Sequence, residues 1–161
     1  MLIAILSDTH MPRGRRRLPD ACTEAIRTAD LLIHVGDIAA VSTLRDLACI
    51  GPPLRAVHGN VDTPELKRKL PERLELSVDE VALGIIHDAG AAAGRAERLQ
   101  GVFPEAAAVI FGHTHVPHHE GGSFQIFNPG SPTERRRAPH RSMGLAEVRG
   151  GRIAFRHLVL T

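Results

Sequence analysis

The sequence predicts a single α/β domain in which two β-sheets pack face to face, with helices outside them. Short apolar runs alternate with helical segments in the first half of the chain, which is typical of strands and helices in sequence alternation. The second half consists mostly of short strand candidates separated by Gly-Gly or Asn-Pro-Gly turns. Because 161 residues are enough for one well-packed core and short for two, we expect one domain over residues 1–161.

The first strand and the first helix are predicted near the start of the chain. Leu2–Leu6 is a short, uninterrupted apolar run, typical of a strand that is buried on both faces. Pro12 and Gly14 predict a loop after it. Pro19 then begins a helix that we expect to reach about Thr28.

Two further strand-and-helix units follow. Leu31–Val35 is predicted as a strand, and the apolar spacing of Val41–Cys49 predicts a helix that Gly51–Pro53 ends. Leu54–Val57 is the third strand. After it, Thr63 and Pro64 have the character of an N-cap and a first helical residue.

The remaining chain is predicted to be mainly β. Arg73–Val78 and Val81–Ile86 are expected to form a hairpin. The Ala-rich segment Ala91–Gly101 is predicted as a helix, and Ala107–Phe111 as the strand that follows it. Four short strand candidates complete the chain: His118–Gly121, Ser123–Phe127, Ser142–Val148 and Arg152–Val159.

Composition is that of an ordinary globular protein, with 43% hydrophobic and 24% charged residues. A formal charge of +2, 3% aromatic residues and no Trp or Tyr argue against a nucleic-acid partner. The basic clusters Arg13–Arg17 and Arg135–Arg137 either hold an anionic substrate or are solvated loops, and Thr133 has the same two interpretations.

Cys22 and Cys49 lack a C-x-x-C spacing, so we interpret both as core residues on helix faces in a reducing compartment. No apolar run approaches the roughly 18 residues of a membrane span, and the first run is too short for a signal peptide. We therefore expect a cytoplasmic protein without membrane contact.

Polar side chains follow five of the apolar runs at the point where each run ends. Because ligands bind outside the carboxyl ends of strands in open α/β sheets, we expect these side chains to meet at one common edge. Asp, Asn and His together suit manganese, iron, zinc or cobalt better than calcium. Seven candidates are too many for one ion and about right for two, and Asp37, after the small Gly36, is best placed to bridge them. The seven are Asp8, His10, Asp37, Asn60, His87, His113 and His115. A pair of cations roughly 3.5–4 Å apart is a common device for hydrolysing phosphate esters, because it activates water and neutralises phosphoryl oxygens.

These motifs together resemble the calcineurin-like metallophosphoesterases, most closely the small single-domain prokaryotic phosphodiesterases, which also resemble the retromer scaffold subunit. The motifs are Asp8-x-His10, Gly36-Asp37, Gly59-Asn60, His87, Gly112-His113-x-His115 and Asn128-Pro129-Gly130-Ser131. The resemblance implies a four-layer sandwich of two mixed β-sheets flanked by helices, with two divalent transition-metal ions, manganese first and iron, zinc, cobalt or nickel as alternatives. It assigns the first metal to Asp8, His10 and His115, the bridge to Asp37, and the second metal to Asn60, His87 and His113. The loop Asn128–Ser131 is expected to shape the pocket.

The chain departs from the family pattern at two positions. Many members have a leaving-group acid directly after the metal-binding Asn, where this chain has Val61, and many have Gly where it has Asp88. His58 is either a substitute catalytic proton donor or a structural histidine at a strand end, and Asp62 is interpreted as a carboxylate that caps the loop. Val61 predicts that esters with good leaving groups react best.

We expect a metal-dependent hydrolase of small phosphodiesters or phosphomonoesters, with a phosphodiesterase favoured. The alternative is a non-catalytic, metal-bound scaffold or interaction module that resembles the retromer subunit. The oligomeric state is left open. The other histidines have structural interpretations: His34 in the core or supporting the site, His118 and His119 on exposed strands, and His140 and His157 at the surface.

Overall fold

β1 (Leu2–Leu6) is the central strand of the first β-sheet, with a parallel neighbour on one side and an antiparallel neighbour on the other. The computed structural model describes residues 1–160. β1 pairs in parallel with β2 (Leu31–Val35), and β2 pairs in parallel with β3 (Leu54–Val57). On its other side β1 pairs antiparallel with β9 (Arg141–Arg149), which forms a hairpin with β10 (Arg152–Leu160). The order is β10-β9-β1-β2-β3.

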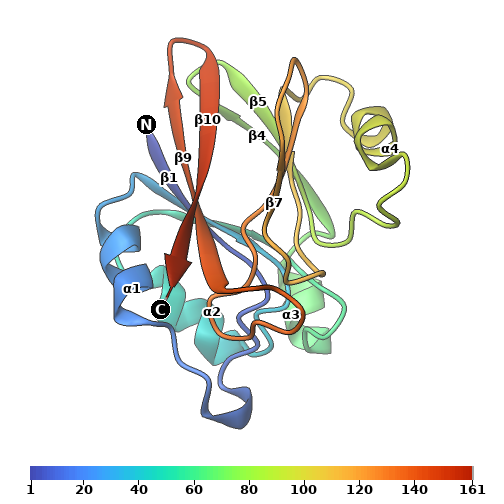
Figure 1. Ribbon diagram of the computed structural model, residues 1–161. Coiled ribbons are helices and arrows are strands. Elements are labelled where there is room, and N and C mark those ends of the chain that lie inside the picture. The colour runs from blue at the N-terminus through green and yellow to red at the C-terminus, as the bar shows by residue number, and fades with distance from the viewer. Residues whose placement is uncertain (161) are drawn as a thin grey trace.

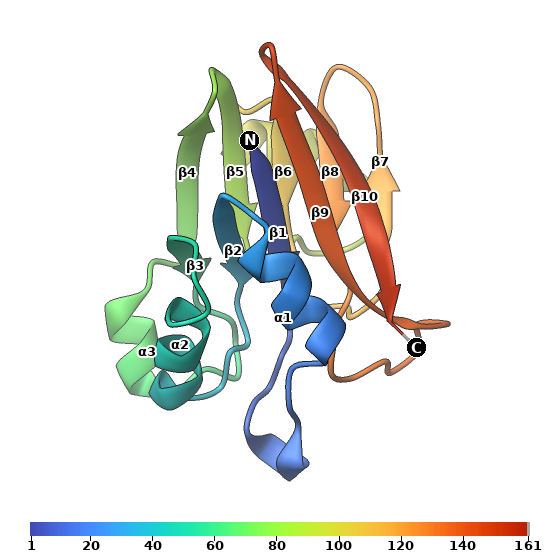
Figure 2. The same ribbon diagram turned by 90° about the vertical axis from the view of Figure 1, so that its left-hand side faces the viewer.

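The second sheet has the order β4-β5-β6-β8-β7 and is also mixed. β4 (Arg73–Val78) and β5 (Val81–Ile86) form the predicted antiparallel hairpin. β6 (Ala108–Ile110) pairs in parallel with β5 and with β8 (Gln125–Asn128). β7 (His118–Glu120) closes the sheet antiparallel to β8. Figure 2 shows the two sheets as neighbouring layers with their strands running in similar directions.

Helices cover the outer faces of both sheets, as Figure 1 shows. α1 (Asp20–Arg27) and α2 (Val41–Ala48) lie on the first sheet, where Ile26 and Leu47 pack in one buried cluster with Leu6. On the opposite side, α4 (Arg95–Val102) covers the second sheet, and Leu99 and Phe103 lie in a separate cluster. A third cluster fills the space between the sheets and includes Ile3 and Ile5 of β1 with Leu83 and Ile85 of β5. The prediction of a four-layer sandwich of two mixed sheets flanked by helices is therefore confirmed.

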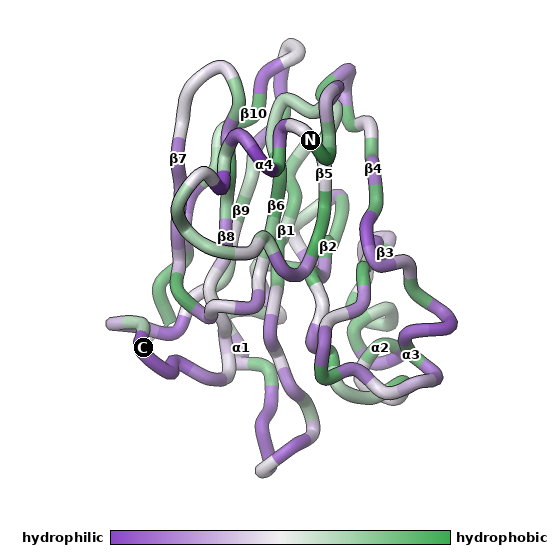
Figure 3. Tube along the Cα trace, turned by 90° about the vertical axis from the view of Figure 1, so that its right-hand side faces the viewer, coloured by the Kyte–Doolittle hydropathy of each residue, from purple (hydrophilic) through white to green (hydrophobic). Residues whose placement is uncertain are grey.

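Local signals place the short helix α3 (Pro64–Lys69) where the sequence predicts it. The Thr63 hydroxyl accepts a hydrogen bond from the backbone N–H of Leu66 (3.4 Å), and Pro64 is the first helical residue. Leu66 is buried against Ile38 and Ala56. Figure 3 shows hydrophobic residues along the central strands and mostly hydrophilic residues in the loops at the lower end of the molecule. Within residues 1–160, no helix has the length and apolar character that crossing a membrane requires.

Three details differ from prediction. α4 spans Arg95–Val102 and so begins four residues later than predicted, because Gly94 precedes it in the left-handed conformation (φ +64°). Cys22 is buried in the core as expected, but Cys49 is exposed at the end of α2 and both thiols are free. His157 is half-buried instead of exposed, because its ring stacks on Phe127 and its Nε2 donates to the carbonyl of Asn128 (2.7 Å).

Candidate metal centre

The seven side chains predicted as metal ligands lie together at one end of the two sheets. They follow the carboxyl ends of β1, β2 and β3 in the first sheet and of β5 and β6 in the second. The expected single sheet edge is thus in fact the meeting point of two sheets, because the parallel strands of both end at the same side of the sandwich. Contacts between the side chains join all seven: Asp8, His10, Asp37, Asn60, His87, His113 and His115.

One group consists of Asp8, His10 and His115. The Nε2 atom of His115 lies 3.3 Å from Oδ1 of Asp8 and 3.2 Å from Nε2 of His10. The two imidazole rings are stacked with their centroids 5.1 Å apart. All three side chains are buried, and their potential ligand atoms lie within 4.8 Å of one another, so this group could hold a metal ion.

A second group surrounds His87. Its Nε2 atom lies 3.4 Å from Oδ2 of Asp37 and 3.2 Å from Oδ1 of Asn60. The same Asn60 oxygen lies 3.0 Å from Nδ1 of His113. Asp8, Asp37 and His87 also have their ligand atoms within 4.8 Å of one another. The two groups are therefore adjacent, with both carboxylates placed between them.

One oxygen of each carboxylate accepts hydrogen bonds from the surrounding protein, and the other points into the centre. Asp8 accepts hydrogen bonds at Oδ2 from the Ser7 hydroxyl (2.6 Å) and the His113 backbone N–H (3.0 Å). Asp37 accepts one at Oδ1 from the Val61 N–H (2.9 Å). Oδ1 of Asp8 is buried and has no hydrogen-bond partner within residues 1–160. Because an unsatisfied buried carboxylate oxygen is costly, this atom fits a site that holds a cation.

Backbone carbonyls orient two of the imidazoles. Nδ1 of His87 donates to the carbonyl of Val35 (2.7 Å), and Nδ1 of His115 donates to the carbonyl of Glu134 (2.9 Å). These bonds direct both Nε2 atoms toward the carboxylates, as metal-binding histidines are commonly held. No signal in the sequence marks the roles of Val35 and Glu134, because both act through the backbone.

The charges of the centre are strongly coupled. Burial opposes ionisation of Asp37, but its hydrogen bond to His87 and the charge of that ring lower the pKa of the carboxyl to about 2. Burial likewise favours a neutral His87, yet Asp37 and Asp8 raise the pKa of the imidazole to about 9. Burial is also outweighed at Asp8, whose pKa is lowered by His115 and His87. The pocket thus favours two ionised carboxylates balanced by positive charge, which a divalent cation would supply.

Most of the seven residues have an unusual backbone conformation. Asp8, His10, Asp37, His113 and His115 all have positive φ angles, between +47° and +69°. Non-glycine residues adopt this left-handed region rarely and at some cost, and such residues concentrate at functional sites. Each therefore forms a sharp turn at a strand end that directs its side chain into the centre.

Glycines allow the loops to approach one another closely. Gly36 has a φ of +90°, and a Cβ atom there would lie 2.7 Å from Nδ1 of His87. A Cβ on Gly59 would collide with the Asp37 carboxylate. The loop Asn128–Ser131 supports the same region, because the Asn128 amide donates to the carbonyl of Gly112 (2.8 Å). No side chain of this loop is among the seven candidate ligands.

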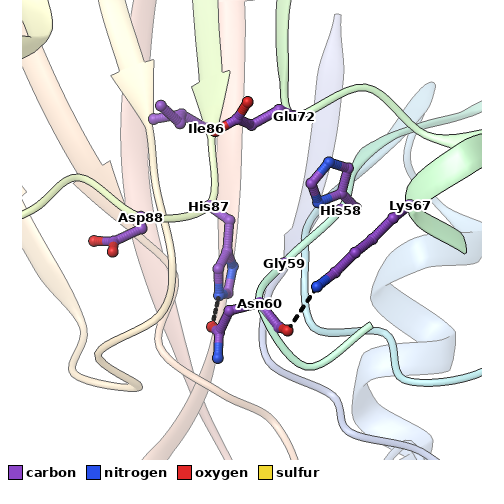
Figure 4. A pocket seen from close by; sticks show the side chains of 8 residues that line it. All are labelled: His58, Gly59, Asn60, Lys67, Glu72, Ile86, His87 and Asp88. Atoms are coloured by element: carbon purple, nitrogen blue, oxygen red, sulfur yellow. Dashed lines mark hydrogen bonds between the residues drawn. The ribbon is translucent and has the colours of Figure 1, made fainter. Parts of the chain in front are cut away.

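A pocket of about 170 Å³ opens beside the second group. Asn60 and His87 line it together with His58, Lys67 and Glu72, as Figure 4 shows. Nδ1 of His58 is buried there without a hydrogen-bond partner within the described chain. The Lys67 ammonium donates to the carbonyl of Asn60 (2.9 Å) and was not predicted, because its direction from α3 depends on the tertiary fold.

Known proteins match most of this chain. A family model described as the calcineurin-like phosphoesterase superfamily domain matches residues 1–151. A probable metallophosphoesterase of Methanothermobacter thermautotrophicus is 32% identical over 136 residues, which cover 83% of this chain and 78% of that protein. Another, from Methanocaldococcus jannaschii, is 36% identical over 141 residues, covering 83% of this chain and 69% of that protein.

Solved structures resemble the chain over almost its whole length. A Thermotoga maritima protein studied by solution NMR is 31% identical, with a TM-score of 0.78 and 99% coverage of both chains. A structure described as a novel archaeal phosphodiesterase has a TM-score of 0.74 at 20% identity, covering 99% of this chain and 100% of its own. Vps29 of Chaetomium thermophilum has a TM-score of 0.80 at 16% identity, covering 100% of this chain and 98% of its own. The latter two likenesses concern the fold.

Proposed function

The chain belongs to the calcineurin-like phosphoesterase superfamily, and we propose that it is a phosphodiesterase that depends on two divalent transition-metal ions. The observation that carries the proposal is that the buried carboxylates of Asp8 and Asp37 each contact histidines of both groups, with Oδ1 of Asp8 left for a cation. Manganese is the first candidate, because Asp, Asn and His form a donor set of intermediate hardness. The preference for diesters is supported by the likeness to the archaeal phosphodiesterase.

The proposal assigns a role to each of the seven residues. Asp8, His10 and His115 would hold one ion, and Asn60, His87 and His113 would hold the other. Asp37 would bridge them, since its Oδ2 lies 3.7 Å from Nε2 of His10 and 3.4 Å from Nε2 of His87. The bound ions would lower the pKa of a coordinated water and neutralise phosphoryl oxygens.

The protein itself positions the ester and its leaving group. His58 lines the pocket next to Asn60 and His87, so we assign it the role of donating a proton to the leaving oxygen. Lys67 holds the Asn60 backbone and places its positive charge on the same wall, where it would favour the phosphate anion. Val61 cannot donate a proton, and its backbone N–H instead fixes Asp37.

Turnover of an aryl phosphodiester with added manganese tests the proposal. His113→Ala removes a nitrogen that contacts Asn60, and we expect it to reduce turnover at least about 100-fold. His140→Ala is the matched control, because His140 is an exposed histidine outside the centre. Equal rates for His113→Ala and the wild-type protein would refute the metal mechanism.

A non-catalytic scaffold is the second candidate, and the likeness of the fold to Vps29 favours it. In that case the centre would stabilise the domain without hydrolysing a substrate. Metal-loaded protein that binds manganese but is inert toward aryl and alkyl phosphodiesters and monoesters would support the scaffold and exclude the enzyme.

A further inference from the structure

A second cavity, separate from the pocket beside Asn60, has arginine at four of its eight lining positions. It has a volume of about 510 Å³ and lies between the loop after β1, the start of α1 and the start of β9. The first two segments contribute Arg15, Arg16, Arg17 and Asp20. The remaining polar lining residues are Thr133 and Arg141. The cluster predicted at Arg13–Arg17 therefore forms part of a concave surface, whereas Arg135–Arg137 does not line it.

The positive charge of this cavity is only partly compensated. Arg16 forms an ion pair with Glu134 (3.1 Å). Within residues 1–160, no carboxylate lies within 4 Å of the guanidinium groups of Arg15 or Arg17, and Asp20 is the one acidic residue among those that line the cavity. Arginines that line one cavity without acidic partners repel one another, and a bound anion would relieve this repulsion.

The cavity is linked to the candidate metal centre by hydrogen bonds but is lined by other residues. The Thr133 hydroxyl donates to the carbonyl of Thr9 (2.7 Å), between Asp8 and His10 in the sequence. Glu134, the partner of Arg16, accepts the His115 Nδ1 hydrogen bond at its carbonyl. None of the residues that line this cavity is among the seven of the centre or lines the pocket beside Asn60.

We propose that this cavity binds a small molecule through a multiply charged phosphate group, at a site distinct from the metal centre. Guanidinium groups bind phosphate and carboxylate oxygens alike with paired, charge-assisted hydrogen bonds, and four arginines around one cavity favour the more highly charged phosphate. None of the residues that line the cavity is aromatic, so no base would stack there and the phosphate itself would carry recognition. The group belongs either to a free ligand or to the far end of a substrate.

Calorimetric titration with inorganic pyrophosphate tests the site. Arg15→Gln/Arg17→Gln should raise the dissociation constant more than about tenfold. Arg45→Gln/Arg149→Gln removes the same charge from exposed positions outside the cavity and should bind like the wild-type protein. His113→Ala should also retain binding, because the cavity does not include the metal centre. An unchanged melting temperature of the Arg15/Arg17 variant would verify that it is folded.

Two results would overturn the proposal: loss of pyrophosphate binding in His113→Ala alone, or an equal loss in both arginine double variants. The binding measurement does not depend on turnover. An inactive protein that still binds pyrophosphate through Arg15 and Arg17 would therefore refute the proposed function and still support this binding site. A substrate with a second phosphate group shows whether the cavity binds part of the substrate or a separate ligand. A rise in its KM in the Arg15/Arg17 variant assigns the cavity to the substrate, and an unchanged KM assigns it to a separate ligand.

Discussion

The Asp62 carboxylate accepts a hydrogen bond from the backbone N–H of Asp37 (3.1 Å), the residue proposed to bridge two ions. The same carboxylate accepts the N–H groups of Ala39 (2.6 Å) and Gly59 (2.7 Å). It therefore ties the loop after β2 to the loop after β3. This confirms the interpretation of Asp62 as a loop-capping residue and explains why a carboxylate is buried there.

We predict that Asp62→Asn lowers both stability and activity. Both carboxylate oxygens of Asp62 accept hydrogen bonds: Oδ2 from the N–H groups of Asp37 and Gly59, and Oδ1 from that of Ala39. Whichever oxygen the amide NH₂ of asparagine replaces, at least one buried N–H group loses its acceptor. The cost should be about 2–3 kcal/mol of unfolding free energy, since buried donors lose a charged acceptor. Urea denaturation and aryl phosphodiester turnover measure the two effects. A variant as stable as the wild-type protein would contradict this role.

Gly36→Ala should disrupt the centre mainly through steric contact with His87. The new methyl group would lie 2.7 Å from Nδ1 of His87, at a residue with φ +90°. Gly150→Ala is the matched control, because Gly150 also has a positive φ (+57°) but no atom within 4 Å of the added carbon. We expect about 1 kcal/mol of destabilisation with full activity at Gly150, and larger destabilisation with lost turnover at Gly36. Equal effects in the two variants would show that backbone conformation, and not contact with His87, decides the outcome.

His58→Ala should distinguish esters by their leaving groups. A proton donor matters most when the departing oxygen is a poor leaving group, so turnover of an alkyl phosphodiester should fall about 100-fold. An aryl phosphodiester, which needs no protonation, should be affected much less. Measured kcat values for both esters test the assignment. If the two rates fall by the same factor, His58 is a structural residue of the strand end.

Manganese should stabilise the fold, and chelation should reverse the effect. A ligand that binds only the folded state stabilises it by about 4 kcal/mol at a free concentration 1,000 times its dissociation constant. The melting temperature should rise with manganese in the wild-type protein and rise much less in Asp37→Asn, which loses the shared carboxylate. An identical rise in both proteins would place the bound manganese outside this centre.

His34 should make stability depend on pH. Burial lowers the pKa of this fully buried imidazole to about 3, below its value of about 6.5 in an unfolded chain. Between these values the unfolded chain binds a proton that the folded chain does not, so this residue's contribution falls as the pH falls, by about 1.4 kcal/mol per pH unit. His34→Gln should flatten the decline in urea-denaturation free energy below pH 6.5. The exposed His140→Gln should leave it unchanged, and parallel pH curves for His34→Gln and the wild-type protein would contradict the prediction.

Strands and short-range signals could be predicted from the sequence because neighbouring residues decide them. Leu2–Leu6 is apolar on both faces, and in the structure those faces meet α1 and the second sheet. Thr63 caps α3 with its own hydroxyl. The start of α4 was missed because glycines and the Arg98 guanidinium, which donates to the carbonyls of Ala89 and Ala91, favour a loop over another helical turn.

The identity of the seven candidate residues could be predicted, but their support could not. Residue type and position at strand ends mark Asp8 and His113, which are 105 positions apart in the chain. The hydrogen bond from the His113 N–H to Asp8, and those from histidine nitrogens to the carbonyls of Val35 and Glu134, arise only when the two sheets meet. Backbone groups carry no residue-specific signal in a sequence.

The origin of the centre in both sheets has a mechanical consequence. Asp8, His10, Asp37 and Asn60 come from the first sheet, and His87, His113 and His115 come from the second. Any separation of the layers must pull these side chains apart at the same time as it exposes the apolar interior between them. A metal ion bound there would connect the two sheets and would slow unfolding of the domain more than its folding.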